Sequence, residues 1–188
     1  MDAARRADRP RPIALTGTPG TGKSRVARSL GARWRVSEVG DLARSAHTAR
    51  GAGRAVEVDL RGLDRWLDRH PAERPDLLVG HLAHLLDVDG AIVLRCRPTE
   101  LRRRLARARR GGPRDRQANA IAEAVDLVLR ESLDRRLRVW EIDTTHRPPD
   151  QVARAVERIL RDRPTPARPR VDWLADPEVT AHLLDRPS

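Results

Sequence analysis

The chain has 188 residues and a formal net charge of +11 at pH 7, with 38 Lys and Arg against 27 Asp and Glu. Its length suits one globular domain, no apolar run reaches a membrane span, and the basic N-terminus lacks the apolar core of a secretory signal. One cysteine excludes an internal disulfide. These properties predict a soluble, cytoplasmic protein with anionic partners such as nucleotides, RNA or acidic proteins. A merely arginine-rich surface explains the charge equally well.

Residues 1–12 carry four arginines and two prolines without hydrophobic periodicity. This composition predicts a disordered basic arm. The alternative is an extension that arises from an earlier start site.

The apolar run Ile13-Ala14-Leu15 predicts a strand near 13–16, and a helical pattern follows over 26–33. Between them, residues 17–24 (GTPGTGKS) fit the phosphate-binding loop G-x-x-x-x-G-K-[ST] at every fixed position. Lys23 would reach the β and γ phosphates, and the Ser24 hydroxyl would hold Mg²⁺. Lys23 is also the only lysine of the chain, at a position where a planar guanidinium would not fit. The alternative is a glycine-rich turn that matches by chance.

The rest of the chain alternates extended and helical patterns. Residues 36–39 look extended, Asp41 can cap a helix that ends at 51–53, and 58–69 is amphipathic. Further strands are predicted at 77–79, 91–94 and 139–142, and helices from Pro98, from Gln117 (apolar face Ile121, Val125, Val128 and Leu129) and over 152–160. This order predicts an α/β fold of the P-loop NTPase type, a three-layer sandwich with a parallel sheet flanked by helices.

Prolines 164, 166 and 169 begin a Pro-rich linker and a C-terminal tail over 164–188. The tail is either disordered, or Trp173 and Leu174 dock on the domain or on a partner. The residue pattern leaves both alternatives open.

Four pieces together resemble one family: residues 16–24 (TGTPGTGKS), 39–44 (VGDLAR), 80–84 (GHLAH) and 139–145 (VWEIDTT). The sequence is similar to the adenylate kinase isoenzyme 6 type, a family with archaeal members, over roughly 13–160. The resemblance implies a P-loop kinase domain over 13–163. Inserted in it would be a nucleoside monophosphate (NMP)-binding region at about 38–58 and a lid at about 109–117.

The resemblance implies a broad-specificity nucleoside monophosphate kinase (ATP + AMP to 2 ADP) that uses Mg²⁺ and also hydrolyses ATP. It further implies late maturation of the small ribosomal subunit, with a platform ribosomal protein and pre-ribosomal particles as partners. One alternative is an ATP-binding ribosome-assembly switch with weak or no kinase activity. Another is a small-metabolite kinase of the same fold, which the VGDLAR piece disfavours.

The resemblance also assigns roles by position. Lys23, His81 and Arg110 would be catalytic, with His81 placing water or substrate near the γ-phosphate and Arg110 acting from the lid. The ATP-binding set is Gly20, Gly22, Lys23, Ser24, Arg25, Arg110 and Arg147, with Arg116 as a possible second lid arginine. The monophosphate-binding set is Gly40, Asp41 and Arg44, whose guanidinium is a natural bidentate clamp for a phosphate.

The chain departs from the family in two places. Family members carry an acid two residues before the motif histidine, where this chain has Val79. A carboxylate at this strand end normally holds the Mg²⁺ shell or the attacking water, so its loss could lower turnover unless Asp41 takes over part of the task. The lid is also about one residue shorter, with Gly112 in place of a larger residue. His84 is expected to be a structural histidine and Cys96 a buried or half-buried thiol.

Overall fold

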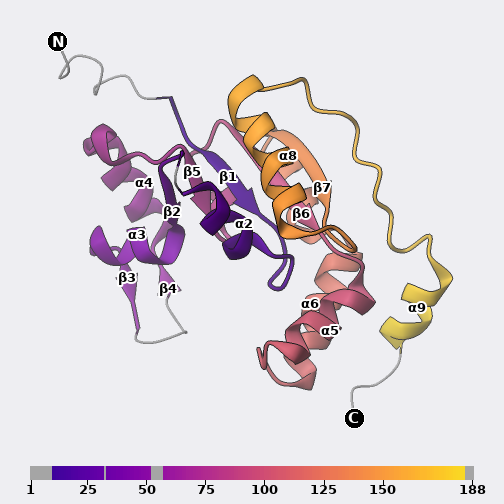
Figure 1. Ribbon diagram of the computed structural model, residues 1–188. Helices are drawn as coiled ribbons and strands as arrows, with labels where there is room; N and C mark the ends of the chain where they lie inside the picture. Colours follow the sequence, from indigo (N-terminus) through magenta and orange to yellow (C-terminus); the bar gives the residue numbers. More distant parts are fainter. Residues whose placement is uncertain (1–9, 32, 52–56, 185–188) are drawn as a thin grey trace.

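The computed structural model describes residues 10–31, 33–51 and 57–184 (Figure 1). Most of the expected basic arm at 1–12 and the tip of the expected NMP-binding region at 52–56 lie outside the described residues. In the described part, no helix is long and apolar enough to cross a membrane.

A five-stranded parallel sheet forms the centre of the molecule, in the order β2-β5-β1-β6-β7. Its strands are β1 (Ile13–Thr16), β2 (Val36–Glu38), β5 (Leu77–Val79), β6 (Gly90–Arg95) and β7 (Arg138–Asp143). A separate antiparallel pair joins β3 (Ala49–Arg50) to β4 (Glu57–Val58). The five strands expected from the sequence are all present, within one residue at each end.

Helices cover both faces of this sheet. The core helices are α2 (Lys23–Leu30) and α8 (Pro149–Asp162) on one face, and α3 (Val39–Ser45), α4 (Leu60–Arg69) and α7 (Leu127–Asp134) on the other. The remaining helices are α5 (Pro98–Arg107), α6 (Pro113–Ala124) and α9 (Pro177–Leu184), with 3-10 turns η1 (Pro71–Glu73) and η2 (Ala83–Leu85). Helix, sheet and helix layers confirm the predicted three-layer P-loop fold.

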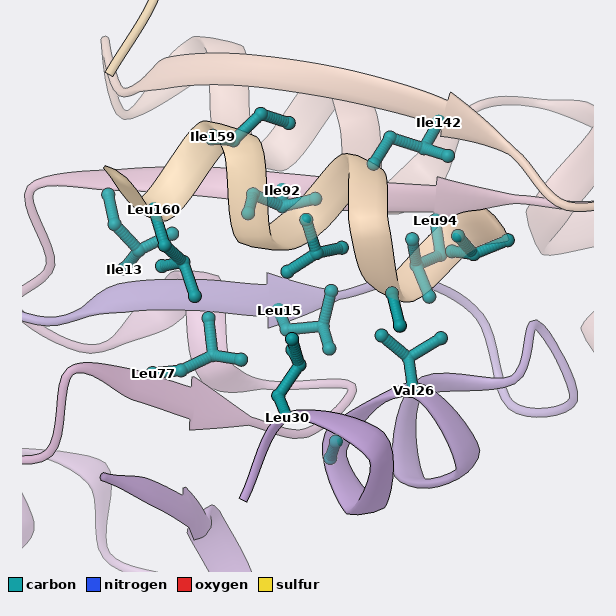
Figure 2. Close-up of a cluster of buried hydrophobic side chains, with 14 of the residues drawn as sticks. Ile13, Leu15, Val26, Leu30, Leu77, Ile92, Leu94, Ile142, Ile159 and Leu160 are labelled. Carbon is teal, nitrogen blue, oxygen red and sulfur yellow. The ribbon is translucent and has the colours of Figure 1, made fainter. Parts of the chain in front are cut away.

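Alternate residues of the strands build the two cores. Leu15, Ile92 and Ile142 point toward α2 and α8, where they meet Val26 and Leu160 (Figure 2). The intervening residues, including Ala14 and Val93, point to the opposite face and pack with α3, α4 and α7. Side chains of a strand alternate between faces, so both helical layers bury apolar surface on one sheet.

Two local expectations were wrong. Asp41 does not cap a helix, because α3 already begins at Val39 and the Asp41 carboxylate accepts a hydrogen bond from Arg44 instead. The helix expected from Gln117 through Leu129 is two helices, and the first starts earlier, at Pro113. Asp126, between the two helices, has a left-handed backbone (φ 58°), and Ile121, expected on the apolar face, is exposed.

The C-terminal tail packs on the hairpin of α5 and α6 (Figure 1). Val179 of α9 is fully buried, and Gln117 of α6 donates a hydrogen bond to the Leu183 carbonyl oxygen (2.7 Å). Arg97, directly before α5, pairs with Asp176 (2.6 Å). Of the two alternatives for the tail, the described structure thus shows docking.

Trp173 and Leu174 differ in this docking. The Trp173 indole N–H donates to Glu123 Oε1 (3.3 Å), whereas Leu174 is 47% exposed. Only Trp173 of the expected pair contributes a polar contact with the body of the domain.

A buried ion cluster ties β6 to α6, α7 and β7. The Arg95 guanidinium is 1% exposed and donates to Glu123 (2.8 Å), to Glu141 (2.8 Å) and to Asp126. Because three carboxylates share one cation away from water, each depends on Arg95 for its compensation.

We therefore expect Arg95→Met to destabilise the fold by about 3–5 kcal/mol, since it removes the cation that three carboxylates share. The measurement is urea unfolding. Arg103→Met is the control: Arg103 is 62% exposed and, in the described part of the chain, pairs with Glu100 alone, so its loss should cost less than about 1 kcal/mol. Equal unfolding midpoints for both variants would contradict the role assigned to the cluster.

Candidate active site

The phosphate-binding loop runs from β1 to α2 with the backbone that the glycines permit. Gly17, Gly20 and Gly22 have φ values of 135°, 99° and 102°. A Cβ added at Gly17 would lie 2.4 Å from the carbonyl oxygen of Leu94, so only glycine fits there. The loop ends in the first turn of α2, where free N–H groups and the helix dipole favour an anion.

Two threonine hydroxyls, those of Thr18 and Thr144, connect this loop to other elements. The Thr18 hydroxyl donates to Glu123 Oε2 on α6 (2.6 Å). The Thr144 hydroxyl, directly after β7, lies 3.1 Å from the Thr21 carbonyl oxygen, and Arg104 of α5 donates to the carbonyl oxygen of Thr144 (2.7 Å). Since Thr18 and Thr144 are buried, the loop is held in shape by these contacts.

Lys23 is the first residue of α2. Its ammonium donates to the carbonyl oxygens of Gly17 (2.6 Å) and Thr18 (3.0 Å). Burial lowers the pKa of Lys23 to about 8, against the raising effect of Glu123 and Glu38, while Arg110 adds to the lowering. Within the described residues, this half-buried cation has carbonyl oxygens alone as acceptors, so it is well suited to gain from a phosphate.

Ser24 and Arg25 follow Lys23 in the same turn, and both are exposed. The Ser24 hydroxyl makes no hydrogen bond within the described residues, so it remains available as an oxygen ligand.

His81 and Arg110 lie near the lysine from two other segments. Partial desolvation and the positive charge of Lys23, with a smaller effect of His84, lower the pKa of His81, whose side chain is exposed. The charge of Arg110, in the turn between α5 and α6, lowers the pKa of Lys23. The exposed His81 and Arg110 side chains thus each lie within electrostatic range of Lys23.

His84 and Cys96 have the structural character expected of them. The buried His84 ring lies 3.0 Å from the Thr16 hydroxyl and 2.9 Å from Glu131 Oε2. Cys96 is buried, and burial raises the pKa of its thiol to about 12, so it is not a thiolate at neutral pH.

The other expected binding residues lie on α3 and in the segment after β7. Gly40, Asp41 and Arg44 are on α3, and the exposed Arg44 guanidinium pairs with Asp41. The Arg147 side chain is exposed, and its backbone N–H donates to the Thr144 carbonyl oxygen (3.4 Å).

Most of the expected lid, residues 109–117, is a tight turn and the start of α6. Arg109 and Gly111 have left-handed backbones, and Arg116 donates to the Gly111 carbonyl oxygen (2.8 Å). Gly112 precedes the first residue of α6, and its backbone N–H donates to Asp115 (2.8 Å).

Sequence reasoning missed the residues that shape the loop. Thr18 and Glu123 are 105 positions apart, and no spacing rule joins them. Arg104 belongs to a run of arginines in which nothing distinguishes it. Glu38 could have been noticed, because it stands at the end of an expected strand.

Comparison with known proteins identifies the family. A family model described as "AAA domain" matches residues 13–126. A "Putative adenylate kinase" of Archaeoglobus fulgidus is 40% identical over 172 residues, covering 88% of this chain and 93% of that protein. A protein of the same name from Natronomonas pharaonis is 39% identical over 166 residues, covering 86% and 96%. The chain belongs to this archaeal adenylate kinase family.

Membership of this family confirms the resemblance inferred from the four motifs and makes a nucleotide kinase the class to which the site belongs. Among solved structures, a shikimate kinase from Bacteroides thetaiotaomicron matches with a TM-score of 0.43 at 15% identity, covering 79% of this chain and 97% of that chain. That likeness is too low to carry an argument about function.

The lowered pKa of Lys23 predicts a pH dependence of ATP binding. Phosphate favours the protonated ammonium, so the pKa rises on binding and the complex takes up a proton when the free lysine is neutral. ATP affinity should be flat below pH 8 and should fall above it, approaching about tenfold per pH unit.

Calorimetry in two buffers of different ionisation enthalpy measures both the affinity and the proton uptake. Lys23→Ala should lose the slope along with most of the affinity. A wild-type affinity that stays constant up to about pH 9.5 would contradict the lowered pKa.

Proposed function

We propose that the protein is a broad-specificity nucleoside monophosphate kinase that converts ATP and AMP to two ADP and also hydrolyses ATP. The observation that carries the proposal is the half-buried Lys23 within a phosphate loop, where it donates to the carbonyl oxygens of Gly17 and Thr18 and feels the charge of Arg110. Family membership supports the same class of reaction.

Phosphoryl transfer requires little covalent chemistry from the protein, so positioning and positive charge supply most of the rate. Lys23 would leave the Gly17 and Thr18 carbonyl oxygens for the β and γ phosphates, and Arg110 would approach the transferred group from the turn of α5 and α6. In this proposal, Gly20, Gly22 and Arg25 contact the phosphates too.

The acceptor side is assigned to α3. Arg44 would exchange its exposed pairing with Asp41 for the phosphate of the monophosphate, and Gly40 lets that phosphate come close to the helix. His81 would orient the acceptor or a water near the γ-phosphate, and Arg147 would lie on the base side of ATP.

Mg²⁺ fits this site on the chemistry of its donors, because the Ser24 hydroxyl is exposed next to Lys23 and hard oxygen ligands suit this ion. The Ser24 hydroxyl would hold Mg²⁺ bound with ATP, and the ion would supply positive charge to the phosphates.

We include a role in late maturation of the small ribosomal subunit in the proposal, with a platform ribosomal protein and pre-ribosomal particles as partners. The net charge of +11 is compatible with such anionic particles. A second candidate function is an ATP-binding assembly switch with weak kinase activity, which the apolar, fully buried Val79 favours. Nucleotide-dependent co-sedimentation with small-subunit particles separates that switch from a purely metabolic kinase.

We expect Lys23→Ala to abolish AMP-dependent formation of ADP, with a loss of at least about 100-fold, because the main cation at the phosphates is gone. A coupled assay across monophosphates at high Mg²⁺ measures this, and Arg103→Ala, an exposed change on α5, should retain the wild-type rate. If the wild-type protein turned over no monophosphate, the kinase proposal would fail.

Arg44→Lys tests the acceptor clamp. The loss of a bidentate contact should raise the KM for AMP by about 10–100-fold and leave the KM for ATP unchanged. Arg61→Lys, an exposed change on α4, is the matched control. Equal KM values for AMP in both variants would remove Arg44 from the acceptor site.

A further inference from the structure

The proposed site has no carboxylate at the strand end where phosphate-loop enzymes carry one. Phosphate-loop enzymes of this type use an acid at the end of a neighbouring strand to hold the magnesium shell. The strands on either side of β1 are β5 and β6, and β5 ends at Val79, which is fully buried and apolar. No oxygen ligand is available at that position.

The sheet register places Glu38 beside this position. Glu38 of β2 pairs with Val79, and Val79 is followed across the sheet by Leu15 of β1. Glu38 thus ends the next strand outward, one interstrand spacing of about 4.8 Å from Val79.

Glu38 also lies on the correct face of the sheet. Val36, two residues earlier, packs against the core under α2, and side chains two apart on a strand share a face. Lys23 begins α2 on that same face. The negative charge of Glu38 raises the pKa of Lys23, so the carboxylate lies within electrostatic range of the lysine.

The other carboxylates near the loop already have partners. Glu123 accepts hydrogen bonds from Thr18 and Arg95, and Asp41 accepts from Arg44. The half-buried Glu38 side chain has neither a hydrogen bond nor an ion pair within the described residues. It is free to take a new partner.

We propose that Glu38 replaces the acid missing at Val79, and that its carboxylate, together with the Ser24 hydroxyl, holds the magnesium of the bound Mg·ATP complex directly or through a water. In this proposal the carboxylate stands on β2 and not on β5, at the position that pairs with Val79. This proposal rests on the proposed binding of ATP at the phosphate loop.

The test measures how much Mg²⁺ strengthens ATP binding, which requires no turnover. Calorimetry gives the Kd for ATP with Mg²⁺ and with excess EDTA, for the wild type, Glu38→Gln and the control Glu73→Gln. Glu73 is exposed in η1, which precedes β5. It therefore lies near the amino-terminal ends of the strands, away from Glu38. In Glu38→Gln the gain from Mg²⁺ should shrink by about 10–100-fold, while the Kd in EDTA stays within about twofold of the wild type. Glu73→Gln should match the wild type in both conditions.

A gain from Mg²⁺ that survives in Glu38→Gln would overturn the proposal for Glu38 and leave the kinase assignment standing. A wild-type protein that binds no ATP would instead overturn the proposed function. The two failures are therefore distinguishable.

A swap of the two positions gives a second, independent result. Glu38→Val combined with Val79→Glu returns the carboxylate to β5, and the gain from Mg²⁺ should recover to within about threefold of the wild type. Thermal unfolding shows whether the double variant is folded. A folded double variant without recovery would contradict the equivalence of the two positions, and if it does not fold, Glu38→Gln alone decides.

Discussion

The carboxylate of Glu123 joins parts of the chain that are far apart in sequence. One oxygen accepts from Thr18 of the phosphate loop, and the other accepts from Arg95 and from the Trp173 indole. A buried carboxylate with this many donors is costly to disturb. The shape of the phosphate loop therefore depends on where α6 lies. The position of α6 depends in turn on the Arg95 guanidinium, which compensates the charge of Glu123.

The parallel sheet explains why the functional groups gather at one edge. The carboxyl ends of parallel strands meet on the same side, so the phosphate loop, Glu38 and His81 follow neighbouring strands there. Lys23 begins α2 on that side and donates to the main-chain oxygens of Gly17 and Thr18.

Much of this fold could be predicted from local patterns, because short apolar runs such as 77–79 and the loop at 17–24 carry their own signals. The helix boundaries near Asp126 could not, since a non-glycine residue with a left-handed backbone leaves no mark in hydrophobic periodicity. Among the residues of the proposed site, Lys23 and His81 are predictions from motifs. The partners of Thr18 and the position of Glu38 depend on sheet register and on contacts between distant segments, which no local spacing contains.

The docking of α9 has a consequence for any movement of the α5–α6 hairpin. Val179 is buried there, Arg97 is paired with Asp176, and Gln117 is bonded to the Leu183 carbonyl oxygen. If the hairpin moves toward bound phosphates, α9 either moves with it as one rigid unit or must first lose its contacts with α5 and α6. In the first case the 163–176 stretch, which links α9 to α8, acts as a tether whose length limits the swing.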